Sequence, residues 1–332
     1  MKKIIVLVVL LIGIFIVILR GDSLAQFLVA IKGAQIAPLL FALLFQLGKY
    51  ALQSLGFSQS FATVEQKISP KTTIKWVFGM FFINTTVPSV GASGIALVVD
   101  DARREGHDPG KAATAVLLLQ TLVDSGFLLI FIIGMLILVA LGQFHWLYIL
   151  LGLIALALVV MMVAAMVLGA KRADKLDQLL SFVERAIGKV YARFTKKTMG
   201  SWHESTAASF STAAKSIGSN KSSAAKVFIY TFASSLCEMA CFYFCCIAYG
   251  QATLPMVIGG YVVATLFAMA SFTPQGIGFV EGSVLLLFSA FGLSAGVSSA
   301  IVITYRSIVF WLPFIVGAIL INATKTFSLR RQ

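Results

Sequence analysis

Long apolar runs separated by short polar connections dominate the sequence. Six of these runs approach the ~20 residues that a helix needs to cross the ~30 Å hydrocarbon layer of a bilayer. They lie at about 4–19, 36–57, 112–141, 146–169, 226–249 and 297–322. Two further runs, 76–99 and 254–292, are each interrupted by a stretch containing proline and glycine. The pattern predicts an all-α polytopic membrane protein with about six full spans and two broken helical hairpins.

The charges of the connections predict opposite orientations for the two hairpins. The connections around 76–99 are basic, whereas those around 254–292 contain no Lys or Arg. The basic residues are Lys67, Lys71, Lys75, Arg103, Arg104 and Lys111. Because Lys and Arg concentrate in cytoplasmic connections, we expect the first hairpin to enter from the cytoplasm and the second from outside, with both chain termini in the cytoplasm. This resembles an inverted repeat whose two breaks meet near the midplane.

The lengths of the arms differ between the hairpins. Each arm of the first is expected to have roughly ten residues, which as helix reaches about mid-membrane. The arms of the second are expected to have roughly 18 residues, so the second hairpin is either re-entrant or two tilted spans.

Composition and charge narrow the class of protein. Of 332 residues, 59% are hydrophobic and only 12% are charged, and the mean hydropathy is +0.95. The Lys and Arg residues behind the net charge of +13 cluster in a few connections between apolar runs, so we expect no nucleic-acid partner.

Three regions are predicted: an N-terminal membrane half (1–170), a basic cytoplasmic segment (171–225) and a C-terminal membrane half (226–325). The segment 171–226 has a helical apolar stripe, which indicates binding to anionic inner-leaflet lipids or, alternatively, docking of a partner protein.

Ionisable residues within apolar runs are candidates for function, because burying a charge in the membrane is unfavourable. Asp124, Glu238, Glu281 and Arg306 lie within such runs. Lys49 does too, but it is close enough to a helix end for its ammonium to extend to the membrane surface. Glu281 and Arg306 could pair, and the pair would either pin two helices together or bind a charged headgroup.

Each break is expected to start a second half-helix, whose free backbone N–H groups favour an anion such as phosphate. The glycines would let that backbone approach a ligand closely, although they could equally serve only as kinks. The predicted substrate-binding residues are Asn84, Pro88, Ser89, Gly91, Gly94, Asp124, Glu238, Pro274, Gln275, Gly276, Gly278, Glu281 and Arg306.

Motifs for catalysis are absent from the sequence. It contains no H-E-x-x-H, no Walker loop and no nucleophile elbow. The four cysteines share one apolar run without a histidine, so we interpret them as packed free thiols. We therefore expect no cofactor, no metal and no enzymatic activity, and any transport would be passive, ion-coupled or driven by another protein.

Four segments resemble the bacterial lysylphosphatidylglycerol synthase transmembrane-region family, which includes the flippase domain of the multiple peptide resistance factor. They are NTTVPSVGASGIALVVDDARREG (84–106), LLLQTLVDSGFLLI (117–130), FTPQGIGFVEG (272–282) and YRSIVFWLPFIVGAI (305–319). The first departs from the family pattern, because Ala92 and Ser93 stand where many members have Glu and Arg.

The resemblance implies a flippase-like protein of the bacterial cell membrane that moves an anionic, aminoacylated or glycosylated lipid between leaflets. The chain ends soon after its last apolar run, which implies a stand-alone member without the synthase domain. A phospholipid or glycolipid substrate is expected, together with a possible homo-oligomer or lipid-enzyme partner. The residues by themselves also allow an ion-coupled small-solute transporter or a non-transporting accessory subunit of a lipid-modifying enzyme.

Overall fold

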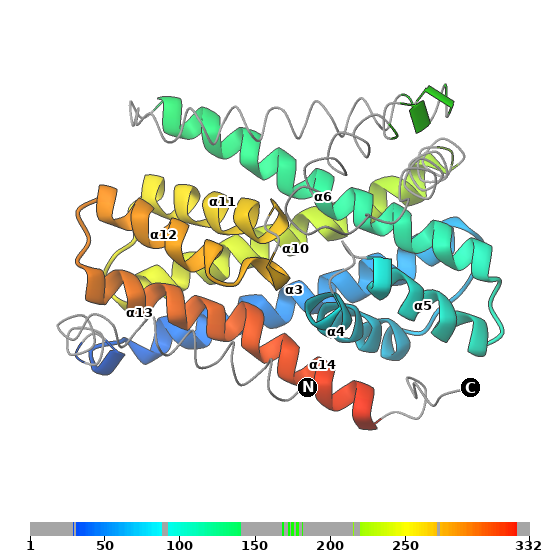
Figure 1. Cartoon of the computed structure of the whole chain (residues 1–332), viewed down its shortest axis with the longest axis horizontal. Helices are drawn as coiled ribbons and strands as arrows, with labels where there is room; N and C mark the ends of the chain where they lie inside the picture. Colours follow the sequence, from blue (N-terminus) through cyan, green and yellow to red (C-terminus); the bar gives the residue numbers. More distant parts are fainter. Residues whose placement is uncertain are drawn as a thin grey trace, which may run out of the picture.

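The computed structural model describes residues 31–87, 92–140, 220–270 and 273–323, together with isolated positions at 29 and between 168 and 215. The predicted span 4–19, almost all of 146–169 and most of the segment 171–226 lie outside the described residues. Within the described ranges every element is a helix, as the apolar pattern predicts (Figure 1).

The helices fall into two sets of similar design. The first set comprises α3 (Ile36–Thr63), α4 (Pro70–Thr86), α5 (Ala92–Arg104) and α6 (Pro109–Ala140). The second comprises α10 (Lys221–Ala248), α11 (Leu254–Ala270), the 3₁₀ turn η1 (Pro274–Gly276), α12 (Phe279–Ala290), α13 (Ala295–Arg306), the π turn η2 (Ser307–Trp311) and α14 (Leu312–Ala323). Both α3 and α10 have 28 residues, and both α4 and α11 have 17.

Four helices are long and apolar enough to cross a membrane, namely Ile36–Thr63, Pro109–Ile137, Lys221–Ala248 and Ala295–Ile321. They correspond to four of the predicted spans. The hairpin arms are shorter than these four helices. The estimate of roughly 18 residues for each arm of the second hairpin fits α11, with 17, but is wrong for α12, with 12. The estimate of ten residues for each arm of the first hairpin is wrong as well. Helix α4 has 17 residues and α5 has 13, because polar first and last turns extend both helices beyond the apolar run.

Side-chain caps determine where several helices begin. A polar residue just before the first turn accepts a hydrogen bond from the backbone N–H three residues later, which satisfies an N–H that has no partner in the helix. These residues are Ser69, Asp108, Asn220 and Ser294.

Helices α3 and α10 run antiparallel through the centre of the bundle (Figure 1). The backbone N–H of Gln35, before α3, donates to the carbonyl of Ala248 at the end of α10 over 2.9 Å. Near the other end of α3, Gly56 packs against Thr231 in the first half of α10. The end of α3 and the end of α10 therefore lie at opposite ends of the bundle.

The two hairpins follow from this arrangement and enter the bundle from opposite ends. Helix α4 starts where α3 ends and packs against α5 and α14, whereas α11 starts where α10 ends and packs against α12 and α6. A glycine permits each contact between halves. Gly317 of α14 lies against the Phe78 carbonyl of α4, and Gly134 of α6 lies against Ile258 of α11.

Apolar side chains form two core clusters in the bundle. One cluster includes Trp76 and Phe61 of the first set, and the other includes Phe242, Tyr261 and Phe288 of the second. All four cysteines are free thiols, and three of them are buried.

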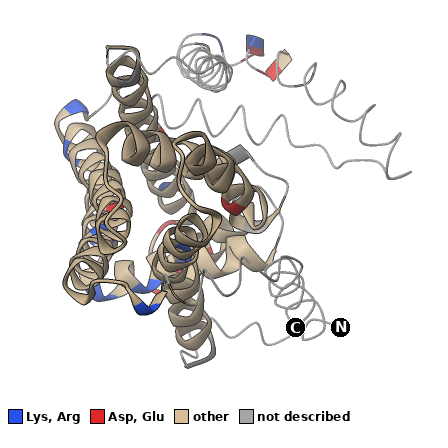
Figure 2. Ribbon diagram, turned by 90° about the vertical axis from the view of Figure 1, so that its left-hand side faces the viewer, with Lys and Arg blue, Asp and Glu red and all other residues tan. Residues whose placement is uncertain are grey.

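Viewed along the bundle, charged residues are sparse among the described helices (Figure 2). The few charges inside the bundle therefore need individual explanations.

Candidate functional site

The second break is a tight turn between α11 and α12. Pro274 opens η1, and Gln275, Gly276 and Gly278 all have left-handed backbone angles, with φ of 51°, 71° and 86°. A side chain at position 276 would lie 2.9 Å from the carbonyl oxygen of Phe267. Both the backbone conformation and the lack of space for a side chain therefore require glycine at position 276. The break is thus a defined turn of the fold.

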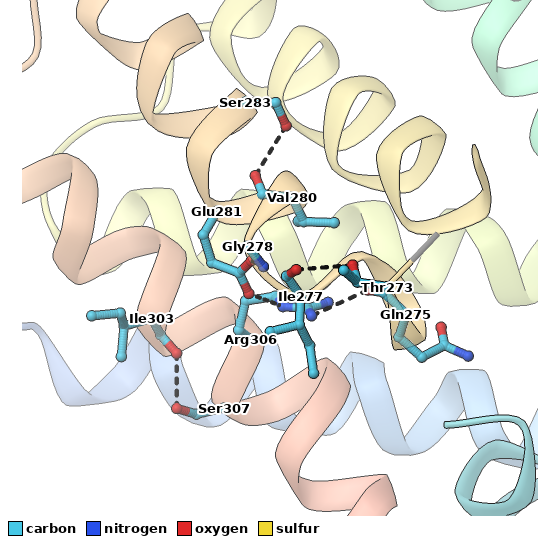
Figure 3. A network of polar contacts seen from close by, with 10 residues as sticks. All are labelled: Thr273, Gln275, Ile277, Gly278, Val280, Glu281, Ser283, Ile303, Arg306 and Ser307. Carbon is cyan, nitrogen blue, oxygen red and sulfur yellow. Dashed lines mark hydrogen bonds and ion pairs between the residues drawn. The ribbon is translucent and has the colours of Figure 1, made fainter. Parts of the chain in front are cut away.

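Arg306 lies beside this break and is buried, with 7% of its surface exposed. Its Nε donates to Glu281 Oε1 over 2.6 Å, and its Nη2 donates to the Gln275 carbonyl over 3.2 Å. Its guanidinium also lies over the ring of Phe310, 4.6 Å from the centroid. The predicted pairing of Glu281 with Arg306 is confirmed, and Figure 3 shows the two side chains pointing toward one another next to the turn.

A π turn follows Arg306 in the same helix. Residues Ser307–Trp311 form this turn, so α13, η2 and α14 make one continuous but locally widened helix. Such turns occur often at functional sites. Nothing in the apolar pattern of the sequence indicates the π turn, and Phe310 beneath Arg306 belongs to it.

Glu281 also occupies the start of α12. Its Oε2 accepts a hydrogen bond from the backbone N–H of Gly278 over 2.6 Å, as the N3 acid of a capping box does. The half-helix start that we expected to attract a phosphate therefore already holds a carboxylate of the protein. An anion at this position would have to compete with Glu281 for the same N–H group and for Arg306.

The first break is closed by an amide instead of a carboxylate. Asn84 Oδ1, on α4, accepts from the backbone N–H of Gly94 on α5 over 2.8 Å. A side chain at position 94 would lie 2.5 Å from the same oxygen, so Gly94 allows this contact. The predicted residues Pro88, Ser89 and Gly91 lie outside the described residues. Helix α4 contacts η1, so the first hairpin and the second break are neighbours.

Glu238 belongs to a second ion pair. Its Oε1 lies 2.5 Å from the Nζ of Lys49, and both side chains are largely but not fully buried, at 17% and 15% exposed. Lys49 thus turns inward to α10 instead of extending to a helix end. The sequence does contain a signal for this pair. One base on α3 and one acid on α10 lie at similar depth if the two helices are antiparallel.

Three tyrosines interact electrostatically with Glu238. Tyr50, Tyr261 and Tyr305 each lie within electrostatic reach of its carboxylate, and the side chains of Tyr261 and Glu238 interact directly. Tyr305 precedes Arg306 and lies within reach of it as well. The buried side chain of Tyr305 therefore lies between the Lys49–Glu238 pair and the Glu281–Arg306 pair, within electrostatic reach of both.

Asp124 belongs to neither ion pair. It is partly buried on α6 and accepts a hydrogen bond from Gln120, one turn earlier, over 3.1 Å. Among the described residues no Lys or Arg forms an ion pair with it. In the same part of the chain, no group of three or more His, Cys, Asp or Glu side chains could hold a metal ion.

Comparison with known proteins agrees with the resemblance of the motifs. A sequence profile described as the lysylphosphatidylglycerol synthase TM region matches residues 4–317, which includes both breaks and the two ion pairs. No curated protein matches the chain. The protein has several apolar helices that could cross a membrane, and the chain belongs to the lysylphosphatidylglycerol synthase transmembrane-region family.

Proposed function

We propose that this protein is a flippase-like translocase that moves an anionic, aminoacylated or glycosylated lipid between the leaflets of a bacterial cytoplasmic membrane. The observation that carries the proposal is a buried, charged Arg306 beside a break in the apolar bundle. A charged side chain inside a membrane domain is unfavourable unless it is paired or binds a ligand. Arg306 also presents a planar array of N–H donors, which suits a lipid phosphate.

The proposed membrane placement follows the loop charges and the orientation of the hairpins. The end of the bundle near Lys67 and Arg103 faces the cytoplasm, and the uncharged connections face outward. Both hairpins are then re-entrant, entering from opposite sides. From their apolar sequences we propose two further spans at 4–19 and 146–169, and from its basic, apolar-striped sequence we propose that the segment 171–226 binds anionic lipids of the inner leaflet.

In this proposal the headgroup passes between the two breaks while the acyl tails stay in lipid. Arg306 binds the phosphate as Glu281 withdraws, because both anions use the same guanidinium. Glu238 interacts with a cationic or hydroxylated part of the headgroup, and the polar ends of both hairpins solvate the remainder. Movement of one hairpin relative to the other half would then change which side of the membrane has access.

The test is a leaflet-resolved transport assay with the purified full chain in liposomes. Labelled lysylphosphatidylglycerol, phosphatidylglycerol and a glycosylated diacylglycerol are each incorporated, with and without an ion gradient, and an impermeant reagent reports the outer-leaflet fraction over time. We expect faster exchange of at least one lipid than in protein-free liposomes, and slower exchange with Arg306→Met. Exchange of none of the three lipids under any gradient would refute the proposal, and uptake of a water-soluble solute instead would indicate a solute transporter.

A further inference from the structure

The two ion pairs differ in how firmly the basic partner is held. Arg306 is held by a carboxylate, a backbone carbonyl and an aromatic ring. Among the described residues, the polar partner of Lys49 is Glu238 Oε1 alone. A lysine ammonium is a compact charge on a flexible stem, whereas arginine is held in a fixed planar geometry. The ammonium of Lys49 is therefore the more readily displaced of the two cations.

The surroundings of Glu238 favour binding of an ammonium group. A carboxylate pairs with an ammonium through charge-assisted hydrogen bonds, and hydroxyl oxygens close by can accept its remaining N–H groups. The hydroxyls of Tyr50, Tyr261 and Tyr305 lie within electrostatic reach of Glu238, and the side chain of Tyr261 interacts with it directly. The side chain of Glu238 is 17% exposed, so the protein does not enclose it fully.

A nearby acceptor has no partner. Gln46 is fully buried on α3, and its Nε2 donates to the Tyr50 hydroxyl over 2.7 Å. Its Oε1 is buried without a hydrogen bond among the residues that the structure describes. Gln46, Lys49 and Tyr50 are three and four residues apart, so they share one face of α3. An ammonium carries three donors, and Gln46 offers an acceptor on the face that carries Lys49.

We infer that Glu238 is a binding site for the primary ammonium group of a lipid headgroup, and that Lys49 fills this site when no lipid is bound. The inference rests on the proposed function, since it assigns the part of the substrate that Glu238 recognises. Substrate binding is then an exchange, in which the lipid ammonium replaces the ammonium of Lys49 on the carboxylate. The released lysine stem is long enough to move aside along α3.

Exchange of Lys49 for a lipid ammonium predicts a rank order of ammonium affinities among Lys49 variants. A pair with a purely structural role predicts no such order. Lys49→Met removes the competing charge and keeps the stem, so ammonium binding should strengthen. Lys49→Arg keeps the pair but holds Glu238 more firmly, so binding should weaken. If the pair only stabilises the fold, Lys49→Arg should resemble the wild type, and Lys49→Met should be impaired in every property measured.

The experiment measures binding of propylammonium to the purified full chain in detergent, by thermal shift and by calorimetry. Propanol serves as the uncharged control, because it has the same apolar chain. If Lys49 occupies the site most of the time, its removal should raise the apparent affinity about tenfold or more. Glu238→Gln should abolish binding. Lys111→Met is the matched control, because Lys111 pairs with Glu65 at an exposed position, and it should behave as the wild type.

The outcomes separate this inference from the proposed function. Tighter binding of propylammonium, but not propanol, to Lys49→Met supports the ammonium site even if no lipid is transported. Recovery of folded Lys49→Met only when propylammonium is present supports it as well. Equal binding by Lys49→Met, Lys49→Arg and wild type overturns it, even if lipid transport is found. Failure of Lys49→Met to fold with or without propylammonium, together with wild-type lipid transport by Lys49→Arg, also overturns it.

Discussion

Neutralising Glu281 should destabilise the protein, because Arg306 would remain buried without its counter-ion. Glu281 accepts two hydrogen bonds of 2.6 Å, from Arg306 Nε and from the Gly278 N–H. The amide oxygen of Gln in Glu281→Gln can still accept from Arg306, but its NH₂ group cannot accept from Gly278. Losing a charge-assisted bond removes about 1.5–3 kcal/mol, and breaking a buried pair outright removes about 3–5 kcal/mol.

We therefore expect Glu281→Gln to lower the stability by about 3 kcal/mol, near the boundary of the two ranges. Glu281 itself is 29% exposed, so part of its charge already interacts with solvent. In a chain of 332 residues, with an unfolding entropy of about 2.1 cal/mol/K per residue, 3 kcal/mol corresponds to a fall of about 4 °C in the unfolding midpoint. The midpoint can be measured in detergent from tryptophan fluorescence, with the monodisperse fraction checked in parallel.

The double variant Glu281→Gln/Arg306→Met separates structure from function. It removes both charges, and a buried ion pair can often be replaced by uncharged residues of similar volume at little change in stability. The double variant should therefore unfold at a higher temperature than Glu281→Gln alone, while lipid transport falls at least about tenfold through loss of a bond to phosphate.

Two results would refute this reasoning. If the double variant is less stable than Glu281→Gln, the uncompensated charge of Arg306 is not the source of the destabilisation. If the double variant is folded and transports lipid at the wild-type rate, the pair has only a structural role. Asp108→Asn is a useful control for the loss of a capping carboxylate away from the site, and it should leave transport unchanged.

Three further substitutions test the fold and the first break. Gly48→Cys should form a disulfide with Cys237 on mild oxidation, because its Cβ would lie 3.7 Å from the sulfur; absence of the crosslink on non-reducing gels would contradict the antiparallel pairing of α3 and α10. Gly94→Ala should displace Asn84 and lower stability by about 1–3 kcal/mol, seen as a lower midpoint that Asn84→Ala does not share in full. Gly317→Val should clash with the α4 backbone and increase proteolysis of the first hairpin; an unchanged digest would exclude this close contact.

Much of the fold could be predicted from local features of the chain. The length of an apolar run determines whether it can cross the membrane, so four of the predicted spans correspond to observed helices. The glycine-rich break at Gly276 and Gly278 could be found because left-handed backbone angles strongly favour glycine. The opposite charges of Glu281 and Arg306 in neighbouring elements already indicated that the two could pair. The arm lengths of the first hairpin could not be predicted in this way. Polar end turns, such as the one that contains Arg103 and Arg104, are part of the helix but not of the apolar run.

The sequence by itself determined the membrane class, the family, the positions of both breaks and the small set of ionisable residues inside the bundle. Only the tertiary structure decided which of these charges meet: that Lys49 pairs with Glu238, and that Glu281 fills the start of α12. The physical reason is that helices apolar on all sides carry no periodic signal for the face that each presents. Their rotation and neighbours follow from close packing between helices distant in sequence, as at Gly317 against α4.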